Sequence, residues 1–516
     1  MASTTNQLLR GSSYGRRIVQ ILGLLGLGAL IMAIASVQSK PLVIGLLLAA
    51  ALVSALWKPE LATTGVVFAL WANVATVAVR FHNVPAIAAG ASFLVLGIPL
   101  FYYVVIRREP MRMNAVIGLM LVYLVVQVAS AEFSADITAS FPALAVFSLQ
   151  GIVLYFLILN TVRTHAQLQR CLWAMVLVGV LLGTLSFIQR VTHSYRKDFA
   201  GFAVSNPFDQ AREAADPTEP VKQSEDQQLE AMYPSWRAMG SLGDPNFYAQ
   251  IMIVLMPIAL LQLWANPGWR VRLSALLALA AILCGVVLSY SRGATLTLCA
   301  LVAALLAFRY LRLRYVVPVI LAVIIFLAIT DPMFIRRIQT LGGESNPRAA
   351  DISILERKTY QIGAWHIFLD HPLLGVGFGQ SPKYVQRYGR MYGNMLGPKD
   401  VAAHNMYLQI LAETGLVGFA AFLLILWAVV RPMFALRRYW AQSRPEYAHT
   451  LTSLMLGLLL FLVTSIFLHL ALTRYFYLLL GLCGAATAIY TPWAEPSAAA
   501  PPRPFSPSRR TAWYEI

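Results

Sequence analysis

Long apolar runs constrain the fold of this chain more than any other feature of its sequence. A helix needs about 20 mainly apolar residues to cross a bilayer, and about fourteen segments approach that length, although the tenth and eleventh are short and the second is bounded by proline. Backbone polar groups inside lipid must be paired within the protein, which favours helices. The runs therefore predict an all-α, polytopic membrane protein with about 12–14 transmembrane helices. They lie at roughly 18–38, 41–57, 62–79, 86–106, 114–131, 143–160, 171–189, 247–264, 273–290, 294–308, 315–330, 406–430, 450–470 and 475–491.

Charged residues are scarce and unevenly placed. They make up 12% of the 516 residues, which is about half of their share in a soluble domain. The net charge of +17 comes mostly from short basic clusters between the runs, as is typical of cytoplasmic loops. Arg10, Arg16 and Arg17 precede the first run, which lacks a small-residue cleavage site. We therefore expect an uncleaved first span, both termini in the cytoplasm and no nucleic-acid partner.

The alternation of basic and non-basic loops divides the chain into six parts. Two long polar segments fall on the outer side, and loops of this length are usually functional or disordered. We expect partial disorder in the first, because Asp209 to Glu230 is rich in Asp, Glu, Gln, Pro and Ala. The second contains Trp, Tyr, Phe and a helical pattern, so we expect it to fold. The parts are 1–189 (N-terminal spans), 190–246 (first long periplasmic loop), 247–330 (spans with a Ser-Arg-Gly motif), 331–405 (second long periplasmic loop), 406–494 (C-terminal spans) and 495–516 (cytoplasmic tail).

Two arginines on the outer side are candidates for binding phosphate, which a planar guanidinium recognises well. Arg292 lies in Ser-Arg-Gly between two apolar runs, where an arginine is costly and a functional candidate, unless it only snorkels to the interface. Arg357, followed by Lys358, opens a helical stretch from Ser353 to Asp370. Such a helix could lie in the interface and present Arg357 to a lipid head group. Alternatively, Arg357 could form a solvated charge pair with Glu356 or Asp351 nearby.

Several polar residues stand where apolar runs begin, and Asn405 among them, like Lys358 beside Arg357, is a candidate for substrate binding. His404, followed by Asn405, precedes the run at 406, and an ordinary pKa of about 6.5 makes a histidine there a possible general base; a purely structural histidine is the alternative. Asp244 and Asn246 belong to Gly-Asp-Pro-Asn before the span at 247, which predicts a turn and a helix cap, with substrate contact as the alternative. Glu413 lies inside the run after His404, so it could orient that histidine or an arginine.

Other patterns do not predict a metal or nucleotide site. His366, Asp370 and His371 match no zinc spacing and are more typical of a helix end. The glycine-dense segment 375–379 follows no strand, which favours a tight turn or a close backbone approach over a dinucleotide site. All four cysteines lie inside apolar runs, without a disulfide framework. We therefore expect no metal and no cofactor.

Several of these motifs follow one another in a recognisable order. Gly-Asp-Pro-Asn precedes a span, and Ser-Arg-Gly follows the next hairpin. The second long loop then carries Arg357, Trp365 and His371-Pro-Leu-Leu-Gly-Val-Gly, and leads to His404-Asn and Glu413-Thr-Gly-Leu-Val-Gly. Over about 240–425 this order resembles the O-antigen ligase and O-antigen polymerase superfamily of bacterial inner membranes.

The resemblance implies an all-helical, membrane-embedded glycosyltransferase of the C type, with its active site on the periplasmic side. Such enzymes take a glycan from an undecaprenyl diphosphate carrier. Ligases transfer it to lipid A–core, polymerases transfer it to another carrier-linked glycan, and protein O-oligosaccharyltransferases form a third alternative. The resemblance also implies an inverting, metal-independent reaction in which Arg292, Arg357 and His404 occupy the key positions. A lipid-linked glycan transporter is the alternative from a different class, but no internal repeat supports it.

Overall fold

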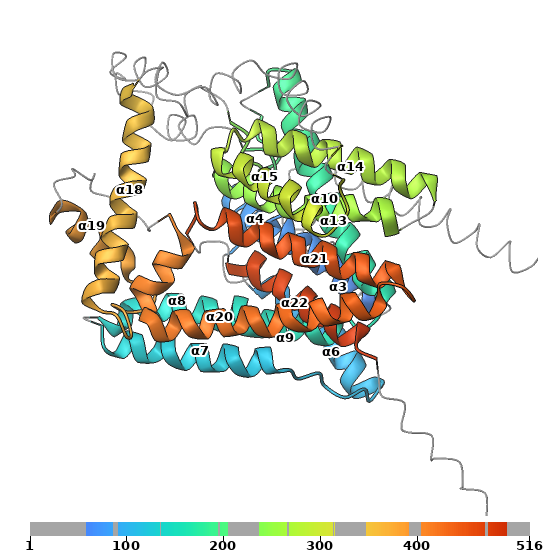
Figure 1. Ribbon diagram of the computed structural model, residues 1–516, viewed down its shortest axis with the longest axis horizontal. Coiled ribbons are helices and arrows are strands. Elements are labelled where there is room, and N and C mark those ends of the chain that lie inside the picture. Colours follow the sequence, from blue (N-terminus) through green and yellow to red (C-terminus); the bar gives the residue numbers. More distant parts are fainter. Residues whose placement is uncertain are drawn as a thin grey trace, which may run out of the picture.

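The protein is described here by a computed structural model (Figure 1), which covers most of the chain. The described residues are 58–85, 91–134, 136–194, 197–204, 237–265, 268–312, 314, 347–391, 404–469 and 473–492. The expected spans at 18–38, 41–57 and 315–330, the segment from Asp209 to Glu230 and the C-terminal tail lie outside these residues.

Helices account for nearly all regular structure in these ranges, which contain no β-strand element. Seven helical stretches, with Ile137–Thr161 counted as one, are long and apolar enough to cross a membrane, or eight if one bent pair is a single span. The predicted all-α, polytopic fold is therefore confirmed. The helices are α3 (Pro59–Trp71), α4 (Val74–His82), α6 (Gly97–Phe101), α7 (Ala115–Glu132), α8 (Phe141–Val146), α9 (Leu154–Thr161), α10 (His165–Val191), α13 (Pro245–Ala265), α14 (Trp269–Leu288), α15 (Arg292–Ala307), α18 (Pro347–Asp370), α19 (Ser381–Met391), α20 (Met406–Trp440), α21 (Pro445–Thr464) and α22 (Thr473–Tyr490), with the short helical segments η1 (Ala91–Leu96), η2 (Tyr102–Ile106), η3 (Ile137–Ser140) and η4 (Phe147–Val153).

Helix α13 packs extensively on α21 and on α14, and α14 packs on α10. Glycines let α10 approach its neighbours closely, as small residues do in membrane helix pairs. A Cβ atom at Gly183 would lie 2.0 Å from the Ala281 carbonyl oxygen of α14, and one at Gly179 would lie 2.7 Å from Leu255 of α13. The close contact of these helices fixes the start of α13, which carries part of the candidate site.

One predicted span is bent. The run at 62–79 forms α3 and α4, which meet at an angle of 60°. Asn73 lies at the bend with a φ of 64°, in the left-handed region that asparagine tolerates better than most residues. Its Nδ2 donates to the Ser241 carbonyl at 2.6 Å, and its Oδ1 accepts from Arg474. The bend thus joins the segment before α13 to the start of α22.

The predicted helical stretch in the second long loop is confirmed as α18, and it does not run with the spans. Figure 1 shows α18 crossing the direction of α7 and α20 near their ends. One face of α18 packs on α19 and on the start of α20, with Tyr360, Ala364 and Ile367 buried against Val385 and Ala412. The helix ends at Asp370, as the pattern before Pro372 predicted.

Helix α20 is broken, whereas the apolar run after His404 predicted a continuous helix. Gly415 has a φ of 63° and a ψ of −162°, a conformation that is essentially confined to glycine. The break leaves backbone groups of α20 without helical partners, and the loop after α18 binds them. The four bonds run from Val376 N–H to the Ala412 oxygen (3.0 Å), from Gly377 N–H to the Glu413 oxygen (3.2 Å), from Leu416 N–H to the Pro372 oxygen (2.8 Å) and from Val417 N–H to the Leu373 oxygen (3.3 Å).

The glycine-dense segment therefore makes the expected close backbone approach. Gly375, Gly377 and Gly379 all have positive φ angles, and a Cβ atom at Gly375 would lie 2.4 Å from the Glu413 carbonyl carbon. No larger residue fits between the loop and α20 at that point. This docking fixes the C-terminal end of α18, and thereby the direction of the helix that carries Arg357.

Candidate functional site

Asp244 caps the first turn of α13, as the Gly-Asp-Pro-Asn motif predicted. Its Oδ1 accepts from the backbone N–H of Asn246 at 2.7 Å and from that of Phe247 at 3.0 Å, which satisfies two free donors of the helix. The carboxylate also interacts electrostatically with Arg357 and with His404. Asp244 is therefore both a cap and the acidic member of the site.

Arg292 is the first residue of α15 and follows a tight turn. Within that turn Tyr290 has a φ of 51°, which is uncommon for an aromatic residue. Arg237, from the first long loop, holds the turn: its Nε donates to the Ser289 carbonyl at 2.9 Å. Its Nη2 also donates to the Asn246 Oδ1 at 3.4 Å. Arg237 thus ties the turn before Arg292 to the first turn of α13.

Arg357 reaches the same place from α18. Burial lowers the pKa of its guanidinium; the Asp244 carboxylate opposes that shift and the Arg292 guanidinium adds to it. An arginine remains charged in spite of such shifts. Arg357 thus lies near one carboxylate and a second guanidinium, and two like charges placed close together favour an anionic ligand between them.

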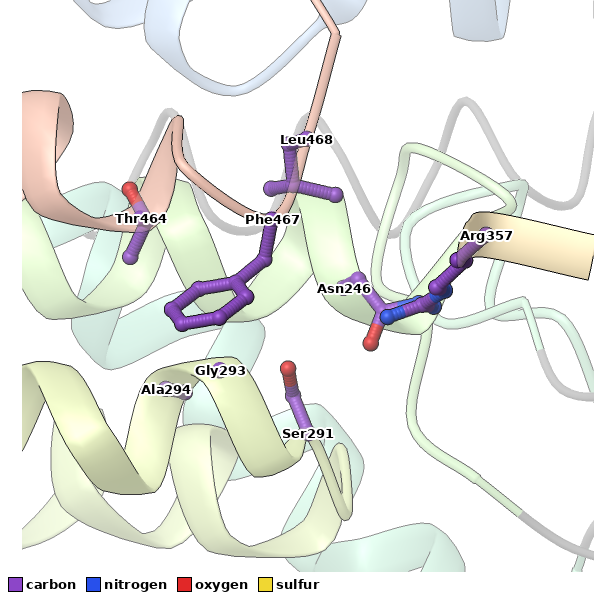
Figure 2. Close-up of a pocket in the computed structure, with 8 residues that line it drawn as sticks. All are labelled: Asn246, Ser291, Gly293, Ala294, Arg357, Thr464, Phe467 and Leu468. Atoms are coloured by element: carbon purple, nitrogen blue, oxygen red, sulfur yellow. The ribbon is translucent and has the colours of Figure 1, made fainter. Parts of the chain in front are cut away.

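A small hollow opens beside these residues (Figure 2). Figure 2 shows the Arg357 side chain extending toward Asn246, with the Ser291 hydroxyl facing the hollow from the start of α15. The opposite wall is apolar and comes from the end of α21 and the connection after it. The lining residues are Asn246, Ser291, Gly293, Ala294, Arg357, Thr464, Phe467 and Leu468.

His404 lies immediately before α20 with a φ of 47°. The next residue, Asn405, caps α20 by accepting from the Tyr407 N–H at 3.0 Å. The imidazole lies beside Tyr360 of α18, with ring centroids 6.0 Å apart. Burial, together with His469 and Arg357, lowers the pKa of His404 to about 4, whereas Asp244 opposes the shift. A histidine held neutral in this way can accept a proton at ordinary pH.

The structure thus brings Arg292, Arg357, His404, Asp244 and Asn246 together at one end of the bundle, and places three other candidates differently. Lys358 is exposed on α18. Asn405 uses its side chain as the helix cap. The buried Glu413 carboxylate accepts from the Ser381 hydroxyl at 2.6 Å and from the Gln409 amide at 3.0 Å, so its hydrogen bonds hold the segment after α18 and not His404.

Two site residues were not singled out from the sequence. Arg237 lies in the first long polar segment, and His469 lies in the connection between α21 and α22. The arguments used for Arg292 and His404 would have found them, because Arg237 is also a basic residue expected on the outer side and His469 also flanks an apolar run. As for metals, no group of three or more His, Cys, Asp or Glu side chains suited to an ion occurs in the part of the chain that the structure describes.

The fold and the site define a polytopic helical membrane protein with a cationic site at one end of its bundle. Residues 251–423, about a third of the chain, match the family model described as O-antigen ligase. This match agrees with the order of the motifs, which resembles that of the O-antigen ligase superfamily. The matched segment contains Arg292, Arg357 and His404, whereas Asp244 precedes it and His469 follows it. A search of curated proteins finds no match to the chain.

Proposed function

We propose that the protein is a glycosyltransferase that moves a glycan from an undecaprenyl diphosphate carrier to an acceptor sugar on the periplasmic face of a bacterial inner membrane. The observation that carries the proposal is the convergence of Arg292, Arg357 and a neutral His404 at one end of the spans. The family supports a reaction of this class, since it comprises O-antigen ligases.

The proposed chemistry assigns one task to each group. The acceptor hydroxyl attacks the anomeric carbon, and the bond from that carbon to the diphosphate oxygen breaks with its electron pair leaving on the diphosphate. The two arginines neutralise the growing charge through bidentate contacts. His404 takes the hydroxyl proton. One direct displacement inverts the anomeric centre and requires no metal in this scheme.

The expected orientation agrees with the distribution of charge. Arg163, whose Nη1 lies 2.8 Å from the Glu109 carboxylate, precedes α10, whose first residue His165 packs on Tyr447 at the start of α21. His404 instead packs on His469, after the opposite end of α21. Basic loops favour the cytoplasmic side, so the site faces the periplasm, where carrier-linked glycans are the activated donors. A transporter would be expected to hold its charges near mid-membrane, which this arrangement does not favour.

The proposed assignment predicts different defects for the arginines and the histidine. Loss of Arg292 or Arg357 to alanine removes a charge-assisted contact that contributes about 2–4 kcal/mol, so transfer should fall by about 30- to 1000-fold. Lysine should rescue only partly, because a point charge cannot replace the planar fork. His404→Ala should retain donor binding but lower turnover by about 10²- to 10⁴-fold.

The experiment measures binding of undecaprenyl diphosphate and glycan transfer for these variants in one detergent. The control is Arg270→Ala, because Arg270 lies at the start of α14 and Arg292 follows its end. If His404→Ala binds and transfers like the parent, the mechanism is wrong. A deletion strain identifies the acceptor: glycan polymer left on the carrier indicates a ligase, whereas a single repeat on the lipopolysaccharide core indicates a polymerase. Unmodified glycoprotein with normal lipopolysaccharide would indicate a protein O-oligosaccharyltransferase.

A further inference from the structure

A second histidine lies against His404 and comes from a part of the chain outside the family match. His469 belongs to the connection between α21 and α22. The two imidazole rings are 5.4 Å apart at 75°, an edge-to-face arrangement. The ring of His469 also packs edge-to-face on Phe247 of α13, at 5.1 Å. The ring of His469 therefore packs between Phe247, at the start of α13, and the proposed base His404.

The backbone around His469 is held as firmly as that around His404. Met406 N–H, at the start of α20, donates to the Ser465 carbonyl at 3.0 Å. Gln250 of α13 donates to the Ser465 hydroxyl, also at 3.0 Å. These bonds join the segment that follows His404 to the segment that precedes His469, so the two rings are placed by one connected set of contacts.

The chemistry of the pair is restricted by its surroundings. Neither Nδ1 atom has a hydrogen-bond partner among the described residues. The charged and titratable groups facing the rings are Asp244 at the start of α13, and Arg357 and Tyr360 on α18. Burial lowers the pKa of His469, and Asp244 opposes that shift. Because a positive charge on either ring disfavours one on the other, both rings stay neutral until one of them receives a proton.

We propose that His469 is a positioning residue for His404, which fixes the plane of its imidazole and keeps that ring uncharged until it accepts the proton of the acceptor hydroxyl. This inference rests on the proposed function, because it requires His404 to act as the base. His469 contacts the base and does not line the hollow beside Arg357, so its loss should change turnover and pH dependence and leave donor binding unchanged.

The test is the pH dependence of kcat for His469→Gln, which cannot titrate, with the exposed His371→Gln as the matched control. His469→Gln should lower kcat at pH 7.5 by about 10-fold, because the imidazole of His404 loses the ring contact that fixes its orientation. It should also move the acid limb of the profile upward by about one pH unit, because His404 no longer takes its proton beside a His469 that is already protonated. The KM for the carrier-linked donor should remain within about twofold.

A second variant separates orientation from charge. His469→Phe restores a ring of similar shape, so it should regain most of the turnover that His469→Gln loses. A rate loss with an unchanged acid limb would show a merely structural role and overturn the proposal, and so would a His469→Gln profile equal to that of His371→Gln. If neither His469 variant folds, the ¹³C-labelled imidazoles of the parent and of His404→Gln decide: the His469 titration must shift when its partner is replaced.

The two proposals fail in different ways. A fully active His404→Ala would remove the general base and with it the proposed mechanism. An inactive His404→Ala combined with a parent-like His469→Gln would remove only the role of His469.

Discussion

Replacing Gly415 by alanine tests whether the break in α20 positions the site. The new Cβ atom would lie 2.3 Å from both the carbonyl carbon and the oxygen of Leu373. Backbone atoms cannot move aside as a flexible side chain can, so the loop after α18 must shift. The φ of 63° and ψ of −162° add strain of about 1–3 kcal/mol for a residue with a Cβ.

The magnitude follows from the bonds that cross the break. A shifted loop would lose one or two of the four backbone hydrogen bonds between the segments 372–377 and 412–417. Each lost bond leaves a buried group unpaired at about 1–3 kcal/mol. With the strain, the total is about 2–9 kcal/mol, which at about 2.1 cal/mol/K per residue in a chain of 516 residues corresponds to a melting temperature lower by roughly 2–8 °C.

The assay compares Gly415→Ala with Gly118→Ala in the same detergent by thermal unfolding and by glycan transfer. Gly118 lies on the neighbouring helix α7, and a Cβ atom there would meet nothing within 4 Å, so alanine should be neutral or stabilise the helix by up to about 1 kcal/mol. The loop continues from α18, so its displacement also moves Arg357. Transfer by Gly415→Ala should fall about 100-fold even below its melting temperature. Equal melting temperatures and equal transfer for the two variants would refute the reasoning.

Three further predictions concern the orientation in the membrane, the need for a metal and the contacts of Arg237. In a background without the exposed Cys299, an impermeant maleimide should label a cysteine introduced at Ser224 or at Gln386 in spheroplasts. If cysteines at both positions are protected and one at Ser443 is labelled, the expected topology is wrong. The purified enzyme should keep its transfer activity in excess EDTA, and an activity lost there and restored by magnesium would reveal carboxylate ligands. Arg237→Lys should lower glycan transfer about 10-fold, because an ammonium group cannot bond both the turn before α15 and the first turn of α13. Activity equal to that of the parent would contradict the proposed role of Arg237 in joining these two turns.

The positions of the helices were accessible from the sequence because bilayer thickness sets the length of an apolar run. The runs at 114–131 and 247–264 correspond to α7 and α13 within a few residues. The break at Gly415 was not accessible. It depends on bonds to a loop about 40 residues earlier, and a local apolar pattern contains no information about such a partner.

The candidate site was predictable where the cost of burial identifies a residue. Arg292, Arg357 and His404 are polar groups at the ends of apolar or amphipathic segments, and the structure brings them together. The partners of Glu413 were not predictable, because periodicity does not reveal which neighbour a buried face meets. His469 stands at the end of an apolar run like His404, but its importance follows only from the ring that it contacts.

The hydrogen bond between the start of α20 and the end of α21 has a consequence for modularity. The family-matched segment ends at residue 423, yet the proposed base is positioned by a connection more than 40 residues beyond it. A chimera that exchanges only residues 251–423 between two relatives would therefore place the transplanted counterpart of His404 beside the recipient's own α21–α22 connection. The helix cap before α13 would also remain that of the recipient. Attempts to change the acceptor by grafting should exchange residues 237–246 and 465–469 together with the matched segment. These three stretches contact one another and together position the site residues.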